Sequence, residues 1–286
     1  MKKILITGAK GQLGSELNVL SKIYNQFEWV FTDREELDLC NLENLATELT
    51  NIKPDYIINC AAHTAVDRAE SEYELSDVLN HKSVAVMANW SENNTCKLIH
   101  ISTDYVFDGT AATALSESAS TGPINVYGVT KLAGEKACME ENPSAIIIRT
   151  SWVYSSFGAN FVKTMSRLMQ ERDTLNVVND QIGSPTYAAD LAQAIMTIIM
   201  HPNWEAGIFH FSNEGEISWH EFALAIQEIG CFDCDISGIP SSAYPTPAKR
   251  PQYSLLDKTK IKATFGVLVP GYRESLVKCM GLLSEK

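Results

Sequence analysis

The sequence predicts an α/β fold, a doubly wound parallel sheet joined to a smaller α/β domain. Three observations carry this prediction. Short apolar runs alternate with helical patterns through the first half of the chain, a glycine-rich turn follows the first apolar run, and the regular alternation is lost after Trp152. Strands that alternate with helices form parallel sheets, because a parallel strand must be reached by a crossover connection.

Five apolar runs in the first half are the predicted strands. Most are continuous stretches of Ile, Val and Leu, which is typical of parallel strands buried on both faces. In chain order they are Lys3–Thr7, Trp29–Thr32, Tyr56–Asn59, Leu98–Ser102 and Ala145–Arg149. Ligands of such sheets bind beyond the carboxyl ends of the strands, so the residues that follow these runs are the first candidates for a site.

Segments with helical periodicity separate the strands and continue into the second half. The predicted helices are Leu13–Ile23, Leu42–Thr50, Val78–Asn93, Ala188–Met200 and Trp219–Ile229. Two further strands are predicted at Thr174–Val178 and Gly207–Phe211, and we expect the chain to cross back once into the main sheet. Pro, Ser and Gly cluster from Ile236 to Pro251, which predicts a less regular region there.

Composition and charge exclude several classes of protein. The chain has 286 residues and a net charge of −12, without a basic stripe, so we expect no nucleic-acid partner. The apolar run near the N-terminus is too short for a signal peptide, and no stretch is long enough for a membrane span. We therefore expect a soluble, cytoplasmic protein. The seven cysteines form no disulfide framework, and the Cys231/Cys234 pair is interpreted as structural.

A glycine-rich turn joins the first strand to the first helix. Gly8, Gly11 and Gly14 are spaced G-x-x-G-x-x-G at this point. Glycines there let backbone N–H groups approach a pyrophosphate at the helix N-terminus, which is the arrangement of Rossmann-type dinucleotide sites. Asp33 ends the second strand, where a carboxylate would hold the ribose of NADH, but Arg34 follows and would suit the 2′-phosphate of NADPH. The sequence leaves both cofactors open.

A proton-donating group is predicted where Tyr127 and Lys131 lie four residues apart at the start of a helical pattern. That spacing places both side chains on one helix face. A nearby ammonium would lower the pKa of the phenol, so that it could exchange a proton with a carbonyl oxygen. Thr103 ends an apolar strand upstream and could hydrogen-bond that oxygen. The three residues are the predicted catalytic set.

Other titratable residues are weaker candidates. His63 follows a strand and is equally compatible with bordering the cofactor or with a structural role. His100 lies within an apolar strand, which favours a structural role. Asp67 belongs to a charged segment that we interpret as a solvated helix start.

At this point the chain resembles one family, the dTDP-4-dehydrorhamnose reductases of the extended short-chain dehydrogenases. The resemblance runs through almost the whole chain. Its motifs are Thr7–Gly14, Ala61–Asp67, Ser102–Phe107, Asn125–Gly128 with Lys131, Arg149–Tyr154, Asn160–Phe161, Asp180–Thr186, His210–Asn213, Ser218–Trp219 and Arg250–Pro251. The later motifs make the match specific, since the first three also occur in related sugar-nucleotide enzymes.

The resemblance implies an NADPH- or NADH-dependent reduction of a dTDP-linked 4-keto sugar, a step toward surface polysaccharide. It implies the same catalytic set, Thr103, Tyr127 and Lys131. For the cofactor it implies contacts from Gly11, Gln12, Leu13, Asp33, Asp38, Leu39, Ala62, His63 and Thr64. For the sugar nucleotide it implies contacts from Thr103, Asp104 and Trp152, and we add Asn160 and Arg250 as diphosphate or nucleotide donors.

The resemblance also implies a division of the chain. Residues 1–152 with about 188–214 would form the dinucleotide-binding domain, and about 153–187 with 215–286 the substrate-binding domain. The remaining alternatives are a reductase of another nucleotide-linked 4-keto-6-deoxysugar and a non-catalytic, cofactor-binding regulatory subunit. Related dehydratases carry an Asp-Glu pair after the strand-end Thr, whereas this chain has Asp104-Tyr105.

The chain departs from the family pattern at two positions, Ala189 and Ser155, and the first concerns metal and assembly. Some members form homodimers bridged by magnesium through glutamates, and Glu16 matches one ligand position. Ala189 stands where a further glutamate is expected, with Asp190 next, which argues against a magnesium-bridged homodimer. Ser155 replaces a Gly that often follows the Trp-Val-Tyr motif.

Overall fold

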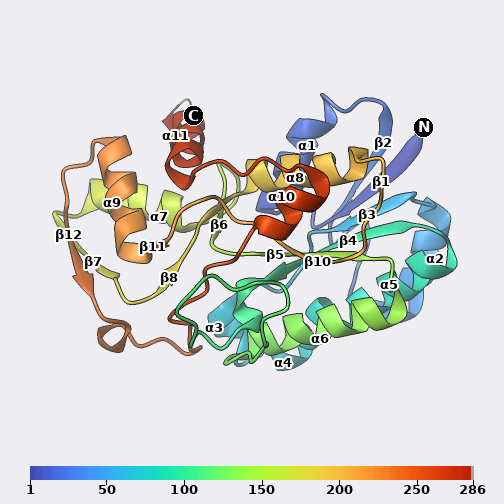
Figure 1. Ribbon diagram of the computed structural model, residues 1–286, viewed down its shortest axis with the longest axis horizontal. Coiled ribbons are helices and arrows are strands. Elements are labelled where there is room, and N and C mark those ends of the chain that lie inside the picture. The colour runs from blue at the N-terminus through green and yellow to red at the C-terminus, as the bar shows by residue number, and fades with distance from the viewer. Residues whose placement is uncertain (285–286) are drawn as a thin grey trace.

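A parallel sheet organises the first part of the chain in the computed structural model, which describes residues 1–284 (Figure 1). Its six strands lie in the order β10-β5-β4-β3-β1-β2, and every neighbouring pair is parallel. The strands are β1 Lys2–Thr7, β2 Phe27–Thr32, β3 Tyr56–Asn59, β4 Lys97–Thr103, β5 Ile146–Thr150 and β10 Gly207–His210. All five strands predicted in the first half are confirmed, and β10 is the expected return of the chain into the sheet.

Helices cover both faces of this sheet, as in a Rossmann-type doubly wound fold (Figure 1). One face carries α1 Gln12–Ser21, α8 Ala188–Met200 and α10 Thr259–Phe265, whose apolar side chains share one core with the strands. The other face carries α2 Leu42–Ile52, α5 Ser83–Asn93 and α6 Val126–Glu141, which enclose a second core. Strand residues such as Leu5 and Ile6 alternate between these two cores, which is why the strands read as continuous apolar runs.

Local sequence signals explain where several helices begin. Asn41 accepts a hydrogen bond from the backbone at the start of α2, and Asn125 does the same at the start of α6. The helix predicted over Val78–Asn93 begins earlier than expected. Short helices precede α5 in the structure: α3 Val66–Ala69, α4 Tyr73–Asp77 and a π-helical turn at Val78–Lys82.

A second, smaller body is built mostly from the later half of the chain and has its own core. It holds three two-stranded sheets, β12-β7, β6-β9 and β11-β8. Its elements are β6 Val153–Tyr154, α7 Phe161–Glu171, β7 Thr174–Val178, β8 Ile182–Gly183, β9 Thr186–Tyr187, β11 Ile217–Ser218, α9 Trp219–Gly230, β12 Asp235–Ile239 and α11 Tyr272–Ser284. Ser218 and Glu221 form a reciprocal capping box that begins α9.

Two parts of this later half differ from the sequence prediction. Asp235–Ile239 lies in the stretch expected to be irregular, yet it forms β12 and pairs in parallel with β7. The strand is largely solvent-exposed and contains Asp, Ser and Gly, so no apolar pattern marks it. In addition, Ile261 and Phe265 of α10 pack into the core of the main sheet rather than into that of the smaller body.

The cysteines are free thiols, and no helix within residues 1–284 is both long and apolar enough to span a bilayer. Cys231 ends α9 in the left-handed backbone region, while Cys234 is buried nearby. The structural interpretation of the pair stays a prediction.

Candidate functional site

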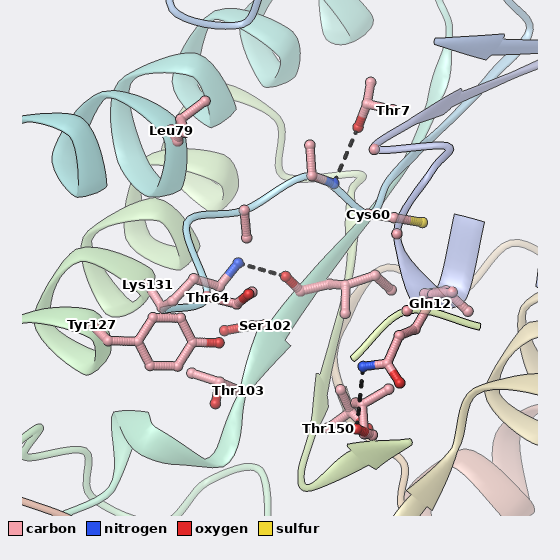
Figure 2. A pocket seen from close by; sticks show the side chains of 18 of the residues that line it. Thr7, Gln12, Cys60, Thr64, Leu79, Ser102, Thr103, Tyr127, Lys131 and Thr150 are labelled. Carbon is pink, nitrogen blue, oxygen red and sulfur yellow. Dashed lines mark hydrogen bonds between the residues drawn. The ribbon is translucent and has the colours of Figure 1, made fainter. Parts of the chain in front are cut away.

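A cleft of about 790 Å³ opens at the carboxyl ends of β1, β3, β4 and β5. Residues from both bodies line it, which fits a site that binds a dinucleotide at one end and a second molecule at the other. Figure 2 shows part of this cleft from close by. The sequence-predicted residues among its lining are Gly8, Gly11, Gln12, Leu13, Asp33, Asp38, Leu39, Ala62, Thr64, Thr103, Asp104, Tyr127, Lys131 and Trp152.

The glycine turn forms the floor of the cleft beside α1. Gly8 has a φ of +66°, and a Cβ there would lie 2.9 Å from the backbone of Ala61, so no other residue fits without movement. Gly14 does not line the cleft. A Cβ at Gly14 would lie 2.4 Å from the Gly8 carbonyl oxygen, so its role is to let α1 pack against the turn. The N-cap residue Gly11 offers no side-chain hydrogen bond, which leaves the first amides of α1 available to an anion.

Asp33 lies at the far end of this turn and accepts hydrogen bonds from the backbone N–H groups of Lys10 and Arg34, at 3.0 and 2.8 Å. These bonds fix the carboxylate beside the turn, where a ribose would lie. Arg34 is exposed and also lines the cleft, so the structure brings both cofactor-discriminating groups to one place. The pair is compatible with NADPH and with NADH.

The predicted catalytic set meets at the centre of the cleft. Tyr127 and Lys131 project from successive turns of α6, and the Tyr127 hydroxyl points toward Thr103 at the end of β4 (Figure 2). The Thr103 hydroxyl lies 3.1 Å from a carboxylate oxygen of Asp104 and accepts the backbone N–H of Tyr105 at 3.2 Å. The Lys131 ammonium donates to the carbonyl of Ile101 at 2.6 Å. A phenol, a hydroxyl and an amine thus surround one point of the cleft.

The pKa of the Tyr127 phenol is raised to about 12, chiefly by desolvation, while its hydrogen bond with Thr103 acts in the opposite direction. The Lys131 ammonium donates to the Ile101 carbonyl and is not among the groups that set this pKa. Its stabilisation of the phenolate stays a prediction. Desolvation lowers the pKa of Lys131 to about 8, although Glu135 partly opposes this. At neutral pH the phenol therefore carries a proton that it can donate.

The substrate end of the cleft has a buried carboxyl group at Asp104, which is 2% exposed. One of its oxygens has no hydrogen-bond partner among the described residues, and burial raises its pKa to about 6 against hydrogen bonds from Ser254 and Thr103. A buried, unpaired oxygen is costly unless a ligand supplies a donor. Asp104 is therefore well placed to accept a hydrogen bond from a sugar hydroxyl.

Trp152 forms an aromatic wall of the same end. Its φ of +48° is unusual for a bulky residue, and its ring stacks on Trp219 with centroids 3.7 Å apart. A Cβ at Gly183 would lie 3.0 Å from the Trp152 ring, so a glycine is needed for the indole to fit. Strain held in place by packing on both sides is common at ligand sites.

Two residues expected to contact the substrate have other partners and do not line the cleft. Asn160 caps α7 by accepting the N–H of Lys163, and its amide nitrogen donates to Gln12 at 3.0 Å, so it orients Gln12 instead. The Arg250 guanidinium binds both carboxylate oxygens of Asp67, at 2.8 and 2.7 Å. Asp67 was interpreted as a solvated charge; it ties the segment around Arg250 to α3.

His63 also lies outside the cleft lining. Its imidazole is 2.8 Å from Glu72 and 2.9 Å from Ser76, and it is buried between α3 and α4. Of the two interpretations that the sequence left open, these contacts support the structural one. Its neighbours Ala62 and Thr64 do line the cleft.

Glu16 is buried within α1 rather than presented as a surface metal ligand. Its carboxylate accepts a hydrogen bond at 2.6 Å from Ser155, the residue that replaces the usual glycine of the family pattern. Across residues 1–284 no group of three or more His, Cys, Asp and Glu side chains is arranged to hold a metal ion. Glu16 thus has a partner within its own chain, and the expectation about a magnesium-bridged homodimer stays a prediction.

Sequence reasoning missed several residues that line the cleft: Thr7, Cys60, Ser102, Thr150, Ser151 and Trp219. Most of them end or follow a strand of the main sheet, so the rule that ligands bind at carboxyl strand ends could have found them. Trp219 had no such signal, because it enters the cleft from the smaller body.

Comparison with known proteins agrees with this geometry over the full chain. The sequence profile of the family described as "RmlD substrate binding domain" matches residues 1–284. The dTDP-4-dehydrorhamnose reductase of Salmonella typhimurium is 41% identical, covering 93% of this chain and 93% of that protein.

Two solved structures share both the fold and much of the sequence. A dTDP-4-dehydrorhamnose reductase from Clostridium acetobutylicum matches with a TM-score of 0.95 at 39% identity, covering 99% of each chain. The dTDP-4-dehydrorhamnose reductase of Bacillus anthracis, solved in complex with NADP, matches with a TM-score of 0.93 at 38% identity, covering 98% of this chain and 99% of that one. With the profile, the relative and both structures in agreement, the chain belongs to the dTDP-4-dehydrorhamnose reductase family.

Proposed function

We propose that this protein reduces the 4-keto group of dTDP-4-dehydro-L-rhamnose to give dTDP-L-rhamnose, with NADPH or NADH as the reductant. The observation that carries the proposal is the meeting of Thr103, Tyr127 and Lys131 in a cleft that also contains the glycine turn. Family membership supports the choice of substrate, and the NADP-bound relative supports the choice of cofactor.

The residues present suit a nicotinamide cofactor: the amides at the start of α1 can bind a pyrophosphate, and Asp33 or Arg34 the adenosine ribose. Bound there, the cofactor would supply a hydride to carbon 4 of the sugar. Thr103 hydrogen-bonds the keto oxygen and fixes its position. Tyr127 donates its proton to that oxygen as negative charge develops, and the phenolate left behind is stabilised by the nearby Lys131 ammonium.

The substrate end supports a sugar nucleotide. The unpaired oxygen of Asp104 can accept a hydroxyl of the sugar, and the Trp152–Trp219 stack provides a flat apolar wall. A reductase needs no second carboxylate beside Asp104, and Tyr105 stands where a dehydratase would carry one. The intact catalytic set disfavours a purely regulatory subunit.

Three further expectations concern the domains, the assembly and the location of the protein. The division into a dinucleotide-binding and a substrate-binding domain is supported by the separate cores, with α10 assigned to the first domain on its packing. A homodimer and a cytoplasmic location stay predictions.

The experiment follows nicotinamide absorbance while purified protein is mixed with NADPH or NADH and a panel of nucleotide-linked 4-keto sugars. We expect oxidation of the cofactor with dTDP-4-dehydro-L-rhamnose and formation of dTDP-L-rhamnose. If the cofactor were oxidised only with another nucleotide sugar, the protein would be a reductase of that sugar instead. Cofactor binding without turnover of any sugar would favour the regulatory subunit.

A further inference from the structure

A chain of buried polar side chains runs from Lys131 across three neighbouring strands. The Lys131 amino nitrogen lies 3.3 Å from Nε2 of His100 on β4. On its other side, Nδ1 of His100 lies 3.0 Å from the side-chain amide of Asn59 on β3. That amide in turn contacts the hydroxyl of Thr7 on β1 at 2.6 Å. The chain ends directly beneath the glycine turn, since Gly8 follows Thr7.

Burial keeps the imidazole of His100 neutral. The four side chains are at most 1% exposed. Burial, reinforced by the charge of Lys131, holds the pKa of His100 well below its ordinary value. A neutral imidazole carries one proton, so one ring nitrogen donates and the other accepts.

The charge of Lys131 decides which nitrogen accepts. An ammonium group can only donate, so Nε2 of His100 must accept and Nδ1 must carry the proton. In the structure the nitrogen of Asn59 faces Nδ1 and its oxygen accepts from the Thr7 hydroxyl, so the ammonium form of Lys131 requires the Asn59 amide to be turned over. When Lys131 loses its proton, the order reverses, with Nε2 donating to the amine and Nδ1 accepting from the amide nitrogen. The amide can take either orientation because its two ends occupy nearly the same positions. In the orientation that the structure has, the Thr7 hydroxyl donates to Asn59 and accepts the N–H of Ala61.

Lys131 has few other partners that could hold it. Its own helix provides Tyr127, Glu135 and Cys138, and Cys60 approaches from the end of β3. Glu135 is engaged by two nitrogens of Arg149, at 2.9 and 2.7 Å, and by the Ser102 hydroxyl. Within the described residues, hydrogen bonds of the amino group are seen only with the Ile101 carbonyl and His100.

We propose that His100 is a positioning residue that holds the Lys131 amino group against the Ile101 carbonyl, and that the side-chain amide of Asn59 accommodates the imidazole tautomer that each charge state of Lys131 requires. This inference goes beyond the reductase assignment, although its kinetic test relies on that activity. It replaces the purely structural role that the apolar strand predicted for His100. This series of hydrogen bonds keeps Lys131 where it can interact with both the phenol of Tyr127 and a cofactor ribose.

The first test compares two variants at His100. His100→Leu removes the acceptor that faces Lys131, whereas His100→Gln retains one. We expect His100→Leu to lower kcat about tenfold or more, as for other lost hydrogen bonds to charged groups. The alkaline limb of its pH profile should move to lower pH, because the ammonium loses a partner and its pKa falls. His100→Gln should retain most of the wild-type kcat, and the alkaline limb of its pH profile should lie at the wild-type pH.

The control is His201→Gln, which alters a histidine at the end of α8 that contacts the Asn203 carbonyl rather than Lys131. It should leave the pH profile unchanged. Equal losses in His100→Leu and His100→Gln, or an unchanged alkaline limb in His100→Leu, would overturn the positioning role.

The second test does not depend on turnover. In the wild-type protein labelled with ¹⁵N-histidine, the His100 imidazole should stay neutral from about pH 6 to about pH 9, and its proton should move from Nδ1 to Nε2 as Lys131 titrates. A His100 that becomes charged near its ordinary pKa, or one that keeps a single tautomer throughout, would overturn the proposal. If the wild-type protein reduces no sugar nucleotide, the proposed function fails and this readout still decides the role of His100.

Discussion

The two ends of the cleft are built in different ways. At the cofactor end, the lining comes from the backbone turn of Gly8 to Leu13 and from the short segments that directly follow β2 and β3. At the substrate end, side chains such as Asp104, Trp152 and Trp219 converge from segments far apart in the chain. A backbone site depends on a few glycines, whereas a side-chain site depends on how the two bodies pack together. Cofactor binding should therefore survive many changes that abolish sugar recognition.

The largest expected effect lies where the two ends meet. Tyr127→Phe removes the proton donor but keeps the ring, so turnover should fall about 10²–10⁴-fold while NADPH affinity is retained. Steady-state kinetics and a cofactor titration would measure both. Tyr24→Phe, which removes a hydroxyl bonded to Gln193 on the far side of α1, is the matched control. Near-normal turnover in Tyr127→Phe would mean that another group delivers the proton.

A second experiment asks how Arg250 acts at the substrate end. It could contact the sugar nucleotide directly, or it could position the neighbouring segment through its ion pair with Asp67. The two carboxylate contacts of Arg250, together with the Ala248 N–H that donates to Asp67, hold residues 248–250 against α3. We expect Arg250→Ala to raise the KM for the sugar nucleotide about tenfold, with a milder effect on kcat. Asp67→Asn should raise KM in the same direction, because it also loosens this segment.

The sign of the Asp67→Asn effect separates the two models. If the Arg250 guanidinium binds the diphosphate directly, loss of the Asp67 charge would free it to bind the diphosphate more tightly. KM would then fall. That outcome would restore the contact that the sequence analysis expected. A double variant with no further loss would indicate that the two residues act as one unit.

At the cofactor end, a single side chain is expected to matter modestly. Asp33→Ala should weaken NADH binding about fivefold and NADPH binding less, because the carboxylate suits a free ribose hydroxyl and Arg34 suits a phosphate. Calorimetric titrations with both cofactors would measure the difference. Equal losses would show that Asp33 acts only by bonding the N–H groups of Lys10 and Arg34.

The last and smallest effect is on the stability of the fold, which the buried Asp104 carboxylate at the substrate end is expected to lower. Burial raises the pKa of Asp104 from 3.8 to about 6, so the fold favours its neutral form. The favourable contribution of that form is complete below pH 3.8 and is lost as the pH rises through about 6. Asp104→Asn mimics the neutral carboxyl, so its Tm should exceed that of the wild type by roughly 5 °C at about pH 8 and match it at about pH 4. Equal Tm values at both pH values would mean that Asp104 carries no such cost.

The same contrast explains what the sequence could predict. Gly8, Gly11 and Gly14 follow a strand and precede a helix, and Tyr127 and Lys131 are one helical turn apart, so their geometry is local and readable. The continuous apolar runs identified the main sheet for the same reason. The cofactor end and the catalytic set were thus accessible without coordinates.

Long-range partners were not accessible. Nothing near Arg250 indicates that Asp67 will neutralise it, and nothing near Ser155 indicates its bond to Glu16. Asn160 was chosen as a donor on charge grounds, but its amide nitrogen already donates to Gln12 and to the Ser155 carbonyl. β12 was missed because an exposed strand of polar residues and glycine has no apolar periodicity.

The order of strands in the main sheet has a consequence for synthesis of the protein. The outer neighbour of β5 is β10, which lies more than fifty residues further along the chain. A ribosome adds about 5–20 residues per second, so β5 waits several seconds for its partner. During that time the edge of Ile146–Thr150, a run of three isoleucines, has unpaired N–H and C=O groups and can pair with another chain. Nascent chains that end between β5 and β10 are therefore the species most in need of a chaperone.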